Sequence, residues 1–146
     1  MKRCVLNLLR IALALILGIA IGGAVNMALI VLGPTVIAPP PGVDMASAEG
    51  LRASMHLLEP RHFLMPFLAH AVGTFVGALA GSLIAVSHRS IVAYAIGTVF
   101  LCGGIAASFM IPAPTGFIVL DLAAAYLPMA WLGLAIANRL KPGAAR

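Results

Sequence analysis

Charged side chains are scarce in this chain. Its 146 residues include four acidic and nine basic side chains, and 62% of the residues are hydrophobic. In soluble domains about a quarter of the residues are charged, so this composition excludes an ordinary water-soluble protein. The net charge of +5 does not indicate a nucleic-acid surface, because the basic residues are spread over several loops. We therefore expect the chain to lie in a lipid bilayer and to bind no nucleic acid.

Catalytic motifs are also missing. The sequence has no phosphate-binding glycine loop, no nucleophile elbow, no paired carboxylates and no Cys-x-x-Cys motif. Its two cysteines, Cys4 and Cys102, lie at different depths of the expected spans, too far apart for a disulfide. A haem between spans would need two axial ligands at one depth, and His70 has no histidine partner there, although a single-ligand arrangement stays open. We expect no cofactor and no enzymatic activity.

What the sequence does contain is long apolar runs, at residues 5–32, 63–86, 91–111 and 115–137. Each reaches the length of about 20 residues that a helix needs to cross about 30 Å of hydrocarbon. The expected fold class is all-α: a four-helix transmembrane bundle that forms a single integral membrane domain over residues 1–146. Pro128 predicts a kink in the fourth span.

The basic residues predict an orientation. Arg52 and Arg61 lie on one side of a four-span arrangement, and the others lie on the opposite side: Lys2, Arg3, Arg10, Arg89, Arg139, Lys141 and Arg146. Lys and Arg are enriched in cytoplasmic loops, so both termini are expected in the cytoplasm and the loop of residues 33–62 outside it, in the periplasm of a bacterium.

This external loop is expected to contain a short amphipathic helix. A stiff polyproline-like stretch at residues 38–42 precedes Asp44, which is the expected N-cap. Apolar residues then recur at helical spacing, at Met45, Ala48, Leu51, Met55 and Leu58. The pattern predicts a periplasmic helix of about 14 residues that lies on the membrane surface or over the mouth of the bundle.

Glycines mark helix-packing faces in the first two spans. Gly18 and Gly22 are four residues apart in the first span, and Gly73, Gly77 and Gly81 follow the same spacing in the second. Residues four apart lie within about 40° of each other around a helix, so a neighbouring backbone can approach such a row closely. We expect these rows to pack helices within the chain, and association between copies is the alternative.

Three polar side chains inside the spans form the main candidate site. At 1.5 Å per residue from the outer ends of the spans, Asn26 and Asp121 lie about 9 Å deep and His70 about 10–12 Å deep. A charge at mid-bilayer is unfavourable by about 2.5–3.5 kcal/mol, and by less nearer the edge, so Asp121 is expected to seek a partner. Within the cluster of Asn26, His70 and Asp121, two interpretations stay open. His70 and Asp121 form either an interhelical hydrogen bond that holds two spans together, or a proton-accepting pair that opens to the periplasm with Asn26 orienting one of them.

A weaker pattern is formed by His56, Glu59 and His62, whose side chains suit Zn²⁺. On one helix each step of three residues turns by about 300°, so the three positions spread over about 120° around the axis and do not converge. We expect no metal site here, although Pro60 could bend the chain enough to gather the three side chains.

Three segments resemble a set of short bacterial inner-membrane proteins with about four spans. These segments are Pro-Pro-Pro-Gly-Val-Asp at residues 39–44, Met-x-x-Leu-Glu-Pro at 55–60 and His-x-x-Gly-Thr-Phe-Val-Gly at 70–77. The resemblance implies a multi-pass protein of the bacterial inner membrane, and it implies no activity, cofactor or catalytic residue.

The leading functional hypothesis is a non-enzymatic accessory or assembly subunit, with a membrane-protein partner or a second copy of the chain. The alternative is a small proton-linked transporter or channel that uses His70 and Asp121. A third hypothesis is an interfacial enzyme that acts on lipid or uses a metal at His56 and His62.

Overall fold

The computed structural model describes residues 2–45 and 47–142, with side chains from residue 5 onward. Within these residues the chain is helical and contains no strand. Its elements in chain order are α1 (Lys2–Val36), α2 (Ala48–Ser54), η1 (Met55–Leu57), η2 (Pro60–Phe63), α3 (Leu64–Ile84), α4 (Arg89–Met110), α5 (Thr115–Ala124) and α6 (Leu127–Leu140), where η denotes a 3₁₀ helix.

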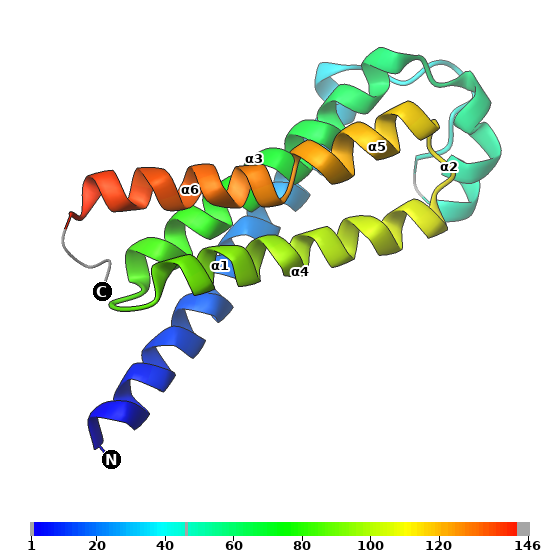
Figure 1. Cartoon of the computed structure of the whole chain (residues 1–146). Helices are drawn as coiled ribbons and strands as arrows, with labels where there is room; N and C mark the ends of the chain where they lie inside the picture. Colours follow the sequence, from blue (N-terminus) through cyan, green and yellow to red (C-terminus); the bar gives the residue numbers. More distant parts are fainter. Residues whose placement is uncertain (1, 46, 143–146) are drawn as a thin grey trace.

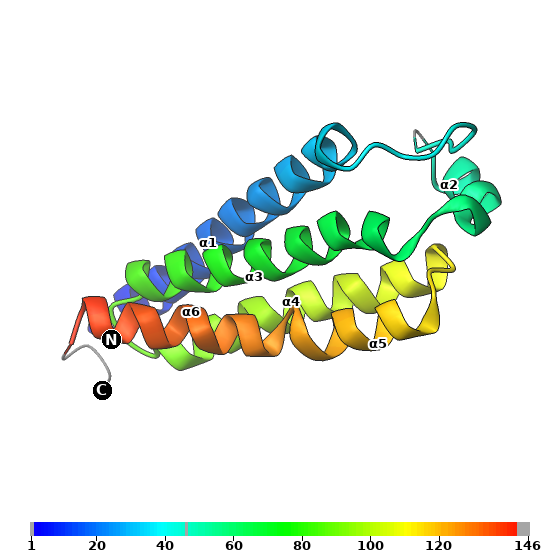
Figure 2. The ribbon, with the colours of Figure 1, turned by 90° about the horizontal axis from the view of Figure 1, so that it is seen from above.

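The four apolar helices expected from the sequence are present. The helical stretches that are long and apolar enough to cross a membrane are Val5–Val36, Pro60–Ile84, Arg89–Met110 and Thr115–Leu140. They run along one another as a bundle, with α3 between α1 on one side and α4 and α6 on the other (Figures 1 and 2). The all-α fold class is thus confirmed.

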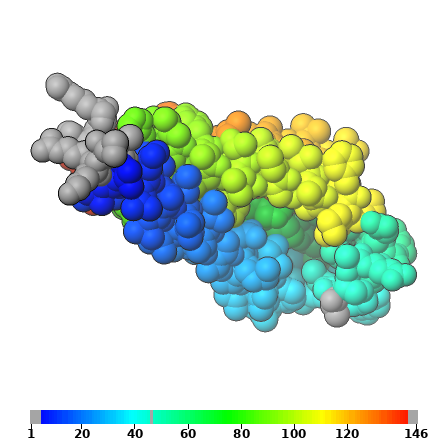
Figure 3. Space-filling model, turned by 90° about the horizontal axis from the view of Figure 1, so that it is seen from below, coloured from blue at the N-terminus to red at the C-terminus, as the bar shows by residue number. Residues whose placement is uncertain are grey.

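The bundle has two different ends. The amino end of α1, the carboxyl end of α6 and the turn between α3 and α4 lie together at what we call the terminal end (Figure 1). The roofed end is covered by residues 37–45 and 47–63, which we call the roof, and by the connection at residues 111–114. The helices α1 and α4 draw apart toward the roofed end (Figure 2), and Figure 3 shows a hollow between them with α3 at its floor.

Two basic side chains tie helix ends together at the terminal end. Arg89 is 4% exposed and donates hydrogen bonds to the carbonyl oxygens of Lys141, at 2.8 Å, and of Ala85, at 3.4 Å. The Nζ of Lys141 donates to the carbonyl oxygen of Leu83 at 3.1 Å. The last carbonyls of a helix lack intrahelical partners and carry partial negative charge, so these cations stabilise the carboxyl ends of α3 and α6.

Helices α1 and α3 pack backbone to backbone through glycine. A Cβ atom on Gly22 would lie 2.6 Å from the carbonyl oxygen of Gly73 and 3.0 Å from the Cα of Gly77. A Cβ atom on Gly18 would lie 2.8 Å from the carbonyl oxygen of Gly77 and 3.2 Å from the Cα of Gly81. The structure therefore places all five of these glycines along one interface within the chain, which we call the glycine seam.

The fourth span is broken rather than kinked. Two residues, Ala125 and Tyr126, separate α5 from α6, and the φ and ψ of Tyr126, −116° and −83°, are not helical. Pro128 lies in the first turn of α6 and lacks the N–H that a continuous helix would need there. After the break, α6 packs closely on α3 at Gly133, where a Cβ atom would lie 2.8 Å from the carbonyl oxygen of Phe75.

The roof contains less α-helix than expected. The helix α2 has seven residues, and its N-cap is Ser47, whose hydroxyl accepts a hydrogen bond from the N–H of Gly50 at 2.9 Å. Asp44, the expected N-cap, instead accepts a hydrogen bond from the Ser47 hydroxyl at 3.2 Å. The expected length of about 14 residues was wrong, because α2 begins after Ser47 and gives way to η1 after Ser54.

Replacing Gly22 with Ala should destabilise the bundle by about 1–3 kcal/mol, because the new methyl group would meet backbone atoms that cannot move independently. Gly23→Ala is the matched control, since nothing lies within 4 Å of a Cβ atom there. The better helix propensity of alanine should leave this control unchanged or stabilise it by up to about 1 kcal/mol. Unfolding in mild detergent, followed by circular dichroism, measures both variants. Equal stabilities for the two would rule out close packing at the seam.

Candidate functional site

Helices α3 and α5 each carry one ionisable side chain, and the two side chains meet. The Nδ1 of His70 lies 2.9 Å and 3.0 Å from the two carboxylate oxygens of Asp121. The Asp121 side chain is 6% exposed and that of His70 is 23% exposed. An ionised carboxylate only accepts hydrogen bonds, so Nδ1 carries the hydrogen and donates it. The structure therefore brings together the two titratable groups that the sequence placed at one depth.

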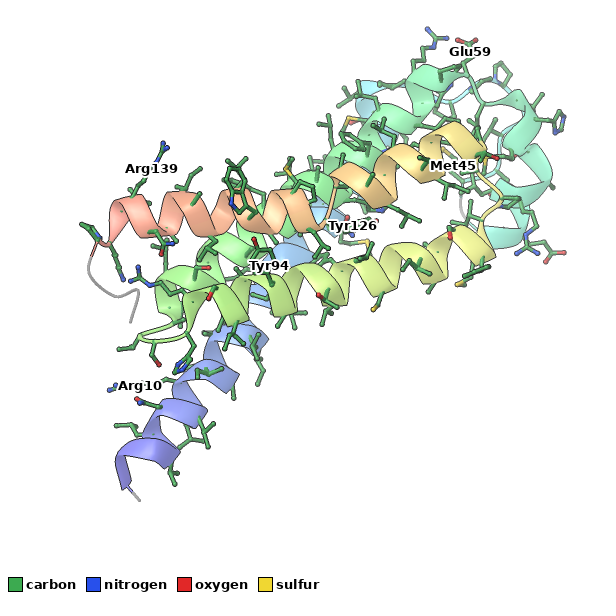
Figure 4. All side chains as sticks on the ribbon, viewed as in Figure 1. Arg10, Met45, Glu59, Tyr94, Tyr126 and Arg139 are labelled. Carbon is green, nitrogen blue, oxygen red and sulfur yellow. The ribbon has the colours of Figure 1, made fainter. Side chains whose placement is uncertain are left out.

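A third residue, Tyr126, completes the surroundings of the carboxylate. Its hydroxyl donates a hydrogen bond to Oδ2 of Asp121 at 2.8 Å, and its ring stacks on that of His70 with centroids 5.8 Å apart. The Tyr126 side chain lies at the break between α5 and α6 (Figure 4) and is 1% exposed. Its hydroxyl packs against Gly104 of α4, where a Cβ atom would collide with it. We call His70, Asp121 and Tyr126 the polar triad.

Sequence reasoning missed Tyr126. Residues five apart on a regular helix lie about 140° apart around its axis, so Tyr126 would point away from Asp121 in an unbroken span. The helix break turns the tyrosine back toward the carboxylate. The signal in the sequence was Pro128, because a proline interrupts the helix and the spacing of residues then no longer predicts which side chains share a face.

Asn26 does not join the polar triad. It lies on α1 beside the glycine seam, and its Cβ atom is 2.8 Å from the position that a Cβ atom added to Gly73 would occupy. Within the described residues its Oδ1 is buried without a hydrogen-bond donor, and no side-chain hydrogen bond joins Asn26 to His70 or Asp121. The expected cluster of Asn26, His70 and Asp121 is thus replaced by a triad with Tyr126 as its third member.

A cavity of about 260 Å³ extends from the polar triad toward the roofed end. Its walls come from α1, α3, α4, α5 and the roof, and most of the lining side chains are apolar, among them Ile30, Met55, Met65, Ala107 and Ile118. The polar side chains that line it are His62, His70, Ser108 and Asp121. The cavity is therefore an apolar chamber with a carboxylate and an imidazole at its inner end.

Two contacts hold the roof over this cavity. The rings of Phe63 in the roof and Phe117 in α5 lie with centroids 5.0 Å apart. The guanidinium of Arg52 donates a hydrogen bond to the carbonyl oxygen of Met110. This carbonyl is at the carboxyl end of α4, where carbonyls have no partner within the helix. The roof is thus joined to both helices that precede and follow the connection at residues 111–114.

The second nitrogen of His70 is available to a ligand. Its Nδ1 is occupied by Asp121, whereas its Nε2 has no hydrogen-bond partner among the described residues. In the neutral imidazole with a hydrogen on Nδ1, Nε2 is an acceptor. A carboxylate that accepts the hydrogen of Nδ1 fixes this tautomer and the orientation of the ring. The pair can therefore accept a hydrogen bond from a molecule in the cavity.

His56, Glu59 and His62 do not converge on a metal position. Glu59 pairs with Arg61, with Oε2 and Nε 3.0 Å apart, and the Nδ1 of His62 accepts a hydrogen bond from the backbone N–H of Glu59 at 2.9 Å. Among the described side chains, at residues 5–45 and 47–142, no three His, Cys, Asp or Glu side chains are grouped so that they could hold a metal ion.

No protein-family model, curated protein or solved structure matches this chain. The function is therefore inferred from the cavity and from the groups that line it.

Replacing Asp121 with Leu should lower the free energy of unfolding by about 1–2 kcal/mol, because the Nδ1 of His70 and the hydroxyl of Tyr126 both lose their acceptor. Chemical unfolding in mild detergent measures the loss. The double variant Asp121→Leu with His70→Phe should recover part of it, since one of the two unpaired donors is then gone. Strictly additive losses would contradict the contact between the two side chains.

Proposed function

We propose that this chain is an integral membrane protein that binds a small apolar molecule in the cavity over the polar triad and does not transform it. The observation that carries this proposal is a chamber of about 260 Å³ with apolar walls that ends at a histidine–carboxylate pair. Small-molecule sites are typically apolar clefts with a few placed polar groups. An ionisable side chain inside an apolar span is costly, which further supports a functional role.

In our proposal the bundle crosses the bacterial inner membrane with its terminal end in the cytoplasm. The distribution of basic side chains supports this orientation, because Lys and Arg are enriched on the cytoplasmic side. The roof contributes Arg52 and Arg61, whereas the helix ends at the terminal end carry Arg10, Arg89, Arg139 and Lys141. The cavity then lies in the periplasmic half of the bilayer.

The cavity favours a carrier that binds and releases on one side over a continuous proton channel. The Nε2 of His70 is placed to accept a hydrogen bond from the bound molecule. Asp121 is the single acidic residue in the four apolar helices, so no second carboxylate continues a proton path toward the terminal end. In the proposal the histidine–aspartate pair therefore binds the ligand and does not pass protons toward the terminal end.

A second candidate function, an accessory or assembly subunit, is favoured by α1. This helix has 35 residues, and its length of about 52 Å exceeds the hydrocarbon core of about 30 Å. Its first turns project away from the bundle (Figure 1), and Leu6, Leu8, Leu9 and Leu13 are each at least 47% exposed. A second protein in stoichiometric amount after a pull-down in mild detergent would support this candidate. Absence of such a protein would argue against it and leave ligand binding as the only proposed function.

Photolabelling tests the binding proposal. Irradiation of the full chain with azioctanol, a photoactivatable alcohol, should give adducts on residues that line the cavity, and excess octanol should suppress them. Ala107→Phe fills the cavity and should reduce these adducts at least fivefold. Ala106→Phe is the matched control, because Ala106 is exposed and does not line the cavity. Adducts confined to the exposed face of α1, or equal labelling of the two variants, would refute the proposal.

Cysteine labelling tests the orientation. In a chain with its native cysteines replaced by alanine, Glu49→Cys in the roof should react with a membrane-impermeant maleimide in cells whose outer membrane alone is permeabilised. Ser90→Cys at the terminal end should react only after the inner membrane is also opened. Both positions are exposed in the structure, so accessibility reports the side of the membrane. The reverse labelling pattern would show that the roof faces the cytoplasm and would contradict the proposed orientation.

A further inference from the structure

One nitrogen in the lining of the cavity is both accessible and unpartnered. The Nδ1 of His70 is bonded to Asp121, whereas its accessible Nε2 has no partner in the described part of the chain. Tyr126 stacks on the imidazole ring, and His70 lines the cavity. With its hydrogen on Nδ1, the neutral ring has a lone pair on Nε2 and only accepts a hydrogen bond there.

The other polar side chains of the lining add no accessible donor. Ser108 donates its hydroxyl hydrogen to the carbonyl oxygen of Ile105 at 2.7 Å, so only the lone pairs of its oxygen remain. The ionised Asp121 is an acceptor alone. The Nε2 of His62 is buried, so a molecule in the cavity does not contact it. The described side chains that line the cavity therefore offer acceptors and no donor.

We infer that the ligand is an uncharged, lipid-soluble alcohol whose hydroxyl donates a hydrogen bond to the Nε2 of His70. This inference rests on the proposed binding function and adds the chemical class of the ligand. The oxygen of an ether, an ester or a ketone only accepts, so it would find no side-chain donor in the cavity. The anion of a carboxylic acid would place a second negative charge near Asp121 between apolar walls.

The position of the cavity favours entry from the bilayer. Its walls include Ile30 of α1 and Ala107 of α4, and Figure 3 shows the hollow between these two helices on one flank of the bundle. In the proposed orientation this flank contacts acyl chains, and the roof, bonded through Arg52 to the end of α4, covers the end that faces water. An ammonium group also donates hydrogen bonds, but its charge is costly in hydrocarbon, so an uncharged hydroxyl matches this route.

Three small molecules with equal numbers of non-hydrogen atoms separate a donor from an acceptor. Octanol carries a hydroxyl, whereas methyl hexyl ketone and heptyl methyl ether carry only an acceptor oxygen. Their affinities are measured from the ligand-dependent thermal stability of the full chain in one detergent. The cavity-filling variant Ala107→Phe gives the part of each shift that comes from the micelle, and this part is subtracted.

His70→Phe removes the accepting nitrogen and keeps an aromatic ring in its place. The ratio of the affinities for octanol and for the ketone should be about threefold to tenfold higher in the unchanged chain than in this variant, as expected for one hydrogen bond. The same difference is expected for octanol against the ether. Because each ligand partitions equally into the micelles of both samples, comparing ratios between variants cancels partitioning.

Asp121→Asn should reverse the group that His70 presents. The amide keeps the shape of the carboxylate, and its oxygen can accept from Tyr126 while its nitrogen donates to the Nδ1 of His70. This arrangement leaves no buried donor unpaired, and it moves the imidazole hydrogen to Nε2. The affinity for the ketone should then rise about threefold to tenfold, whereas that for octanol should change little, because a hydroxyl also accepts. A histidine that served packing alone would not produce this reversal.

Ser108→Ala is the matched control, because it removes the other polar side chain of the lining that carries a hydroxyl. Its preference for octanol should stay within about twofold of that of the unchanged chain, since the hydroxyl of Ser108 contributes only a weaker acceptor. His70→Phe carries the test where Asp121→Asn does not fold.

The outcomes separate this inference from the proposed function. Equal ratios in the unchanged chain and in both variants of the pair, together with azioctanol adducts in the cavity, would overturn the inference and leave the binding function standing. A preference that is lost in Ser108→Ala and kept in His70→Phe would overturn it too. Absence of stabilisation by octanol would also overturn it, and together with absence of cavity adducts it would remove both proposals.

Discussion

A carboxylate inside an apolar helix depends on the protein for its hydrogen-bond donors, because hydrocarbon supplies none. Asp121 receives a donor from His70 across the interface with α3 and another from Tyr126 beyond the helix break. This single requirement joins α3 to both halves of the fourth span at one level. It also sets the floor of the cavity, because the chamber begins where the triad ends.

The cavity itself follows from a change in packing along α1. Toward the terminal end, glycine faces glycine, and the backbones of α1 and α3 approach until carbonyl oxygens occupy the space that a Cβ would need. Toward the roofed end this pairing stops, and Gly33 faces the side chain of Met65, 3.1 Å from the position of an added Cβ. One half of the bundle is therefore closed by small residues, and the other half is held apart by larger ones.

The sequence was sufficient for those features that depend on hydropathy and on spacing along a regular helix. It predicted four apolar helices, and it placed His70 and Asp121 at a common depth. Depth alone does not fix the direction in which a side chain points, so Asn26 was grouped with the pair although it faces the glycine seam. Tyr126 was missed because the break near Pro128 changes the direction in which residues after it point. The cavity was missed because its shape depends on how five elements diverge. The membrane, the orientation and the function stay predictions.

The break in the fourth span gives its two halves different attachments. The half formed by α6 is fixed to α3 at Gly133 and, through Lys141, to Arg89. The half formed by α5 is joined to the roof through Phe117 and to α4 by a connection of a few residues. The roof also continues into α1 and α3 and is bonded to the end of α4, so α5 is held at its roofed end by the rest of the bundle. The hydrogen bond from Tyr126 to Asp121 spans the break, so a change in the angle between α5 and α6 would act directly on the carboxylate that His70 also contacts.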